Sequence, residues 1–325
     1  QRMHLIADRV EAGLPAHPPE LFSILAKTLA TDEADTRGLR GFLVWPLTEI
    51  VARRGLAPEH FADAMQLFSK MTKCFTAEFA IRPFLRAHRE RTLVQLHAWC
   101  GHPDEHVRRL VSEGSRPLLP WGGNLPELLE SPHPTLKLLE KLHRDPSDYV
   151  RLSVSNHLND FSKHHPELVI ETLTRWQKAN PDDPRLAKLA RHACRTLLKA
   201  GHPGALEFHG YGSAKSLELE AIELAETTVK SGGSLGYRLM VRNATRRPLK
   251  VMFDYAIHHR KANGSLSPKV FKGRVRELAS GEVWEIAGRH SFKPVTTRVY
   301  HPGIHHFEPR INGKAFPVRK FVLEM

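Results

Sequence analysis

The pattern of hydrophobic and polar residues divides the chain into two parts. Between residues 17 and 212, apolar residues recur every three or four positions in stretches of ten to fifteen residues, separated by Pro or Gly. This spacing predicts amphipathic helices joined by short turns. From residue 213 onward, apolar and polar residues alternate in runs that break at Gly232-Gly233 and at 243–248, which indicates strands and turns.

The second part has the strand content of a known architecture. About seven short strands in some 110 residues is the number found in an immunoglobulin-like sandwich, here without its cysteine pair. We therefore predict an all-α repeat solenoid over residues 1–212, followed by an all-β immunoglobulin-like sandwich over residues 213–325.

The helical part also repeats itself. Residues 102–116 align without gaps with the stretch at 145–160 at an offset of 43, and residues 187–201 align with that stretch at an offset of 40. Residues 75–85 are a weaker, earlier copy. A period near 40 belongs to HEAT-like helical pairs, which stack into a solenoid with a long concave face.

The middle copy indicates which side of each repeat helix faces solvent. Val150, Val154 and Leu158 fall on one side and form the expected buried stripe, whereas Asp148 and Asn159 point the opposite way. In the other copies, the corresponding polar positions are rich in cations. The expected DNA-binding residues of the solenoid are Arg108, Arg116, Arg151, Lys188, Arg191, Arg195 and Lys199.

The charge distribution points to a polyanionic partner. The chain carries a net charge of +13, and residues 213–325 hold 20 Lys and Arg against 10 Asp and Glu. Phosphate contacts from such residues neutralise a nucleic acid backbone and release counterions. In the sandwich, the basic pairs expected at turns are Arg246-Arg247 and Arg260-Lys261. For Arg82, Arg108 and Arg151, and also for the stripe from Lys188 to Lys199, the alternative to phosphate contact is a structural bond to an Asp of a neighbouring turn.

Other function classes find little support in the sequence. No uninterrupted apolar run reaches about 18 residues, so no membrane span is expected. Cys74, Cys100 and Cys194 are isolated, which suits a reducing compartment. The histidine pairs at 164–165 and 305–306 have no carboxylate or cysteine beside them at the spacing that a metal site needs. We expect a cytoplasmic monomer without a metal. Because no methionine precedes Gln1, a few N-terminal residues are expected to be missing.

Three stretches resemble a known family. They are WCGHPDEHVRRLVSEGSRPLLPW, DPSDYVRLSVSNHLNDFSKHHPELV and RLAKLARHACRTLLKAGHPGALEFHGY, and they are similar to the AlkC branch of the HEAT-repeat DNA alkylation-repair glycosylases over residues 20–212. The resemblance implies hydrolysis of the N-glycosidic bond of cationic N-alkylated bases such as 3-methyladenine in duplex DNA. It also implies that no cofactor is needed and that the lesion is cleaved without being flipped into a deep pocket.

The chemistry of that reaction selects candidate catalytic residues. A cationic alkylated base leaves readily, so the enzyme must stabilise an oxocarbenium-like sugar and an incoming water, which a carboxylate does. Glu113 is the first choice and Asp148 the second. The structural alternatives are a salt bridge from Glu113 to Arg116, and a favourable interaction of Asp148 with its helix dipole.

Four further residues are candidates for contact with the lesion or its sugar. Trp121 lies in a Pro- and Gly-rich loop, where either sugar contact or packing under the loop is open, and Asn156, Asn159 and Asp160 form a polar group. If the carboxylates have only structural roles, the chain is a non-catalytic HEAT scaffold that binds DNA or a protein.

Overall fold

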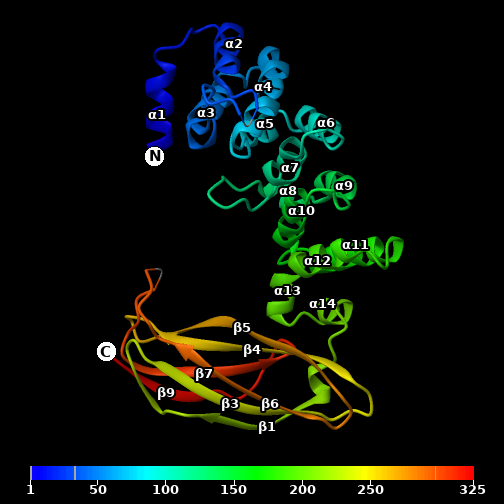
Figure 1. Cartoon of the computed structure of the whole chain (residues 1–325), viewed down its shortest axis with the longest axis vertical. Helices are drawn as coiled ribbons and strands as arrows, with labels where there is room; N and C mark the ends of the chain where they lie inside the picture. Colours follow the sequence, from blue (N-terminus) through cyan, green and yellow to red (C-terminus); the bar gives the residue numbers. More distant parts are fainter. Residues whose placement is uncertain (1, 33, 297) are drawn as a thin grey trace. The chain divides into compact units, whose positions relative to one another are not determined.

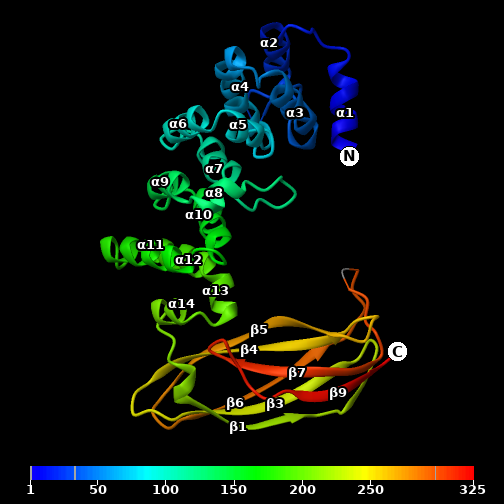
Figure 2. The ribbon, with the colours of Figure 1, turned by 180° about the vertical axis from the view of Figure 1, so that it is seen from behind.

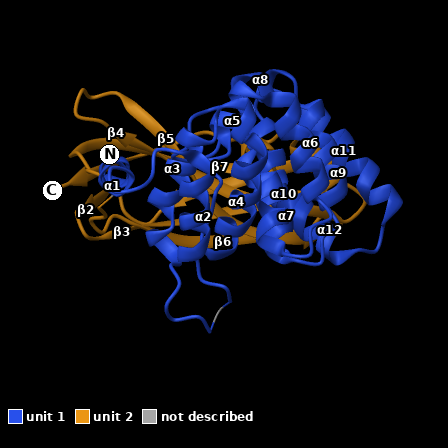
Figure 3. Cartoon of the chain, turned by 90° about the horizontal axis from the view of Figure 1, so that it is seen from above, with its two compact units in different colours: residues 1–194 blue, residues 195–325 orange. Residues whose placement is uncertain are grey.

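The computed structural model describes residues 2–32, 34–296 and 298–325 and contains two compact units, residues 1–194 and 195–325 (Figure 3). The predicted order of a helical array followed by a β-sandwich is confirmed. Gln1, before which missing residues are expected, lies outside the described residues. No helix in the described ranges is long and apolar enough to cross a membrane.

The first unit consists of helices, labelled in Figure 1. The α-helices are α1 (Arg2–Glu11), α2 (Pro18–Thr28), α3 (Trp45–Arg54), α4 (Phe61–Cys74), α5 (Arg82–Ala87), α6 (Arg89–Trp99), α7 (Glu105–Gly114), α8 (Pro126–Glu130), α9 (His133–Leu142), α10 (Asp148–Phe161), α11 (Pro166–Ala179) and α12 (Pro184–Ala193). Two 3₁₀ turns, η1 (Gly41–Leu43) and η2 (Pro58–His60), precede α3 and α4.

The helices alternate between two layers. Helix α10 packs against α7 and α12 in its own layer and against α9 and α11 in the other. In Figures 1 and 2, α6, α9 and α11 lie on one side of this stack, and the loop between α7 and α8 extends from the opposite side. The predicted buried stripe is confirmed, because Val150, Val154 and Leu158 are all fully buried.

Capping residues fix where the repeat helices begin. Asp104, Ser147 and Asp183 each accept a hydrogen bond from the backbone N–H two residues ahead, at the N-termini of α7, α10 and α12. These caps lie 43 and 36 residues apart, so the predicted offset of 40 for the last copy is wrong by one helical turn. A shift of four residues preserves an apolar stripe, which is why hydrophobicity alone did not reveal the error.

The last copy is also not one helix. Helix α12 ends at Ala193, Cys194 leaves helical geometry with φ −82° and ψ 4°, and a new helix begins at Arg195. The predicted stripe of four cations is therefore divided, with Lys188 and Arg191 on α12 and Arg195 and Lys199 on the next helix.

The second unit begins with two short helices and a 3₁₀ turn and continues as strands. These elements are α13 (Arg195–Ala200), α14 (Pro203–Phe208), η3 (Ala214–Ser216), β1 (Leu217–Leu224), β2 (Thr228–Lys230), β3 (Ser234–Asn243), β4 (Leu249–Arg260), β5 (Leu266–Leu278), β6 (Val283–Ser291), β7 (Gly303–Ile311), β8 (Lys314–Ala315) and β9 (Arg319–Glu324). One sheet has the order β1-β3-β6, and the other has the order β2-β9-β7-β4-β5 with β8 paired to β7. Leu239, Ile257, Ile286 and Phe307 are buried in the core of this sandwich.

The short helices pack with the sandwich at a pair of glycines. Gly201 and Gly313 have φ of +74° and +76°, and a Cβ placed on Gly313 would lie 1.9 Å from the Cα of Gly201. Nearby, the Asn312 side chain donates to the Gly212 carbonyl oxygen at 2.6 Å and accepts from the Met252 N–H at 2.7 Å. The predicted boundary at residue 212 thus marks the change from helix to strand, whereas the compact units divide at residue 194.

Candidate active site

Glu113 lies in the last turn of α7, surrounded by groups that bind its carboxylate. Its Oε1 accepts from Arg116 Nη1 at 2.7 Å and lies 3.6 Å from Arg109 Nη2, and its Oε2 accepts from the Ser153 hydroxyl of α10 at 2.6 Å. The residue is 6% exposed. Two cations and a hydroxyl therefore hold a mostly buried carboxylate in a fixed orientation.

Arg116 connects Glu113 to the end of α10. Its guanidinium forms a bidentate pair with Asp160, with Nε–Oδ2 and Nη2–Oδ1 distances of 3.0 and 2.9 Å. Burial lowers the pKa of Arg116, but its pairing with Asp160 and Glu113 outweighs this and raises the pKa overall. For Asp160, burial has the larger effect and raises the pKa. Both side chains are buried and bind each other, which indicates a structural role, and the contacts of Arg116 with DNA and of Asp160 with the sugar stay predictions.

Asp148 has a different environment at the first turn of α10. Its side chain is 66% exposed and pairs with Arg151 and, at 3.1 Å, with Lys188 of α12. The hydrogen bond from Lys188 and the charge of Arg151 lower the pKa of Asp148. The carboxylate is therefore ionised and reachable from solvent.

Two other arginines predicted to contact DNA are bound by the protein itself. Arg108 forms a bidentate pair with Asp145 at 2.6 and 3.0 Å and donates to the His102 and Pro103 carbonyl oxygens. Arg151 donates to the Asp145 carbonyl oxygen and to Asp148. We correct both assignments to the structural alternative, because each guanidinium already binds turns of its own solenoid.

Arg109 of α7 and Tyr149 of α10 form a further contact near Glu113, which the sequence pattern did not indicate. Tyr149 is 41% exposed, and the Arg109 guanidinium lies 5.0 Å from the centre of its ring. Leu152 follows Tyr149 on the same face and is 49% exposed. The exposed Tyr149 and Leu152 give this face an apolar surface on which a sugar or base can pack.

Asn156 belongs to the same face and contacts the next repeat. Its Oδ1 lies 2.9 Å from Nε2 of His192 on α12. Asn156 and Asn159 are both half-buried. In the register set by the helix caps, Asn156 corresponds to Glu113 of α7 and to His192 of α12, so correct alignment of the three copies would have revealed His192.

Trp121 lies at the tip of the loop between α7 and α8. It is 97% exposed, which excludes the alternative of packing under the loop. Its backbone φ is 62°, a left-handed conformation that is uncommon for a bulky residue.

The remaining predicted cations lie on exposed parts of both units. Lys188 and Arg191 are exposed on α12 and Lys199 on α13, whereas Arg195 is half-buried. The predicted cations of the sandwich are also exposed: Arg246 and Arg247 between β3 and β4, and Arg260 and Lys261 where β4 turns toward β5. These residues stay candidates for phosphate contact.

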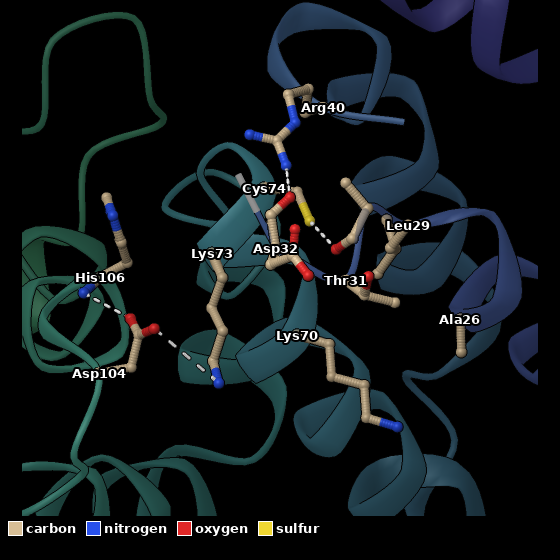
Figure 4. A pocket seen from close by; sticks show the side chains of 11 residues that line it. Ala26, Leu29, Thr31, Asp32, Arg40, Lys70, Lys73, Cys74, Asp104 and His106 are labelled. Atoms are coloured by element: carbon tan, nitrogen blue, oxygen red, sulfur yellow. Dashed lines mark hydrogen bonds and ion pairs between the residues drawn. The ribbon is translucent and has the colours of Figure 1, made fainter. Parts of the chain in front are cut away.

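A polar hollow of about 550 Å³ lies beside the N-terminus of α7 (Figure 4). Arg40, Lys70 and Lys73 line it together with carboxylates, and Lys73 Nζ lies 3.9 Å from Asp104. His106 lines the same hollow and makes an edge contact with Tyr149. In the part of the chain that the structure describes, no group of three or more His, Cys, Asp or Glu is arranged to hold a metal ion.

Comparison with known proteins gives matches in both parts of the chain. A family described as "DNA alkylation repair enzyme" matches residues 53–197. A second, described as "Uncharacterised protein YhaZ, C-terminal Ig-like domain", matches residues 218–325. The uncharacterised protein YhaZ of Bacillus subtilis (strain 168) is 38% identical over 314 residues, which cover 97% of this chain and 84% of that protein.

A solved structure is similar over the whole chain. It is the Pseudomonas fluorescens alkylpurine DNA glycosylase AlkC bound to DNA containing an abasic site analog, with 32% sequence identity and a TM-score of 0.88. The match covers 100% of this chain and 88% of that chain.

Proposed function

The chain belongs to the AlkC branch of the DNA alkylation repair enzyme family, and on this premise we propose that it is an alkylpurine DNA glycosylase. Its substrate is duplex DNA that contains cationic N-alkylated bases such as 3-methyladenine. The reaction hydrolyses the N-glycosidic bond and leaves an abasic site. The observation that carries the proposal is the Glu113 carboxylate, held between two arginines and Ser153.

The properties of the substrate decide what the protein must supply. An alkylated purine already carries a positive charge, so it leaves as a neutral base and needs no protonation by an acid. The sugar left behind develops positive charge at C1′, and water must attack that carbon. A fixed carboxylate stabilises this charge without reorganising as it develops, and its free lone pairs can accept a hydrogen bond from the water.

Glu113 is suited to this role by the groups around it. The Ser153 hydroxyl and the Arg116 guanidinium each bind one carboxylate oxygen, so the plane of the carboxylate is fixed. Tyr149 and Leu152 supply neighbouring apolar surface for the sugar. Asp148 is more exposed and ionised, and it adds a second negative charge at the start of the neighbouring helix α10.

The position of Glu113 also favours cleavage without base flipping. The polar hollow of Figure 4 is lined by His106 and not by Glu113. Glu113 instead lies where α7 meets α10, next to the face on which the Arg109 guanidinium packs against the exposed Tyr149 ring. A duplex resting on that face would bring the sugar of the lesion to the carboxylate. We expect the protein to act as a monomer without a cofactor.

Release of alkylated bases from methylated duplex DNA tests the proposal. Duplex DNA treated with a methylating agent is incubated with the protein, and free bases are quantified by liquid chromatography. We expect Glu113→Gln to lower the rate about 100-fold, as for other preorganised transition-state contacts. We expect a smaller loss for Asp148→Asn. Glu171→Gln, an exposed position on α11, is the matched control and should retain full activity.

The outcomes separate the alternatives. If the unsubstituted protein releases no base above background, the glycosylase proposal is refuted in favour of a non-catalytic scaffold that binds DNA or a protein. If Asp148→Asn loses more activity than Glu113→Gln, the ranking of the two carboxylates is wrong.

A further inference from the structure

The loop over residues 117–125 presents a tryptophan to solvent under strain. Trp121 is 97% exposed, whereas Trp99, Trp176 and Trp284 are between 2% and 7% exposed. Its φ of 62° is a conformation that glycine or asparagine adopts far more readily. Tryptophan disfavours both this exposure to solvent and this left-handed backbone conformation. The folding of the loop alone therefore does not explain why position 121 is a tryptophan.

The backbone of the loop is nevertheless held by hydrogen bonds from a buried arginine. The guanidinium of Arg82, which is 1% exposed, donates to the carbonyl oxygens of Gly114, Arg116 and Gly123 at 3.0, 2.8 and 2.9 Å. The Gly122 N–H donates to the Leu119 carbonyl oxygen at 3.1 Å, which closes a turn around the tryptophan. The backbone that carries the indole is therefore fixed before any partner arrives, which lowers the entropy lost on binding.

The same bonds join the loop to the candidate active site. Arg82 binds the carbonyl of Gly114, the residue after Glu113. Asp160, which pairs with Arg116, also accepts from the Leu118 N–H at 3.3 Å. Since Arg116 binds Glu113 as well, one network of hydrogen bonds sets the position of both the carboxylate and the loop.

The charges around the loop indicate the kind of partner. Residues 117–125 contain no acidic side chain. The exposed Arg86 lies against the loop and donates to the Asn124 carbonyl oxygen at 3.1 Å. An exposed aromatic ring next to a cation is the combination that binds a nucleobase and its phosphate.

We infer that Trp121 is a preorganised stacking residue that contacts a nucleobase of duplex DNA exposed at the lesion. The inference rests on the proposed function for its choice of DNA as partner. Apolar side chains that enter a base step unstack it and bend the duplex, which would widen access to the sugar that faces Glu113. The loop then acts as a wedge whose position relative to the catalytic carboxylate is fixed by Arg82.

The experiment measures binding, so that it does not depend on catalysis. Affinity is determined by fluorescence anisotropy for a labelled duplex with one tetrahydrofuran abasic-site analogue and for the intact duplex. Trp121→Gly removes the indole and accepts the backbone conformation, and Trp121→Phe keeps an aromatic ring. Val94→Ala, an exposed apolar position on α6 that is 72% exposed, is the matched control.

We expect Trp121→Gly to weaken binding to the tetrahydrofuran duplex about tenfold, Trp121→Phe to recover most of the loss, and Val94→Ala to change nothing. Tryptophan emission of the unsubstituted protein should be quenched by this duplex, and Trp121→Gly should remove the quenching. Unchanged affinity and quenching in Trp121→Gly would overturn the inference, even if the protein releases alkylated bases. Conversely, Trp121-dependent binding without base release would leave the inference standing and refute the proposed glycosylase.

Discussion

His157 provides a sharp test of the energetics of the repeat interface. This residue of α10 is fully buried, and its Nδ1 lies 3.0 Å from the carbonyl oxygen of Ser112, the residue before Glu113. A carbonyl oxygen only accepts, so Nδ1 carries the proton and Nε2 is the bare, buried nitrogen. Burial lowers the pKa of His157 to about 3, and the ring stays neutral in the folded protein.

The sign and size of the pH effect follow from that shift. An unfolded histidine has a pKa near 6.5, so between pH 6.5 and about 3 the unfolded chain binds a proton that the folded chain does not. The contribution of His157 to stability is therefore complete above pH 6.5 and is lost as the pH falls. From pH 7 to pH 5 the loss amounts to about 2 kcal/mol of unfolding free energy.

Urea unfolding followed by helical circular dichroism measures this loss. His157→Asn keeps a donor for the Ser112 carbonyl oxygen but cannot titrate. Between pH 7 and pH 5, the unfolding free energy of this variant should therefore fall by about 2 kcal/mol less than that of the unsubstituted protein. His164→Asn, an exposed neighbour, is the control and should keep the original pH dependence. The raised pKa of Asp160 acts in the opposite direction but is common to all three proteins. Equal pH dependence in His157→Asn and the unsubstituted protein would refute the reasoning.

Two further predictions follow from the ionic contacts. Asp160→Asn leaves the buried Arg116 with Glu113 as its remaining carboxylate partner, and we expect a loss of about 1.5–3 kcal/mol in unfolding free energy, the range for a lost hydrogen bond to a charged group. A loss below about 1 kcal/mol in urea unfolding would show that Arg116 is hydrated at this position. For DNA binding, the slope of log affinity against log salt should flatten by about 0.9 for each phosphate contact removed when four cations are replaced by alanine. The four are Lys188, Arg191, Arg195 and Lys199. An unchanged slope would show that they do not contact phosphates.

The fold was predictable because each of its parts has a local signal. Helix periodicity, strand alternation and the repeat at 102–116 and 145–160 are all written in short stretches of sequence. The register of the last copy was not, since a shift of one turn leaves Leu186, Leu189 and Ala193 on the buried side. The cap at Asp183 carries the information that hydrophobicity lacks.

The site was predictable only in part, because its contacts cross from one repeat to the next. The salt bridge from Glu113 to Arg116 is local and was foreseen, whereas the hydrogen bond from Ser153, forty residues later, was not. Arg108 looked like a phosphate ligand because its partner Asp145 is in the following repeat. The loop that carries Trp121 is held by Arg82, whose three carbonyl partners cannot be read from spacing.

The glycine pair at residues 201 and 313 bears on how this sandwich can be inherited or exchanged between proteins. Either glycine tolerates no side chain, because each backbone occupies the space where the other's Cβ would stand. Asn312 likewise depends on Gly212, which precedes the first strand. A gene fusion with its junction near residue 212, where helix changes to strand, would transfer Gly313 without Gly201. The contact between the two glycines would then be lost. The transferable module is therefore residues 195–325, with α13 and α14 travelling as part of the sandwich.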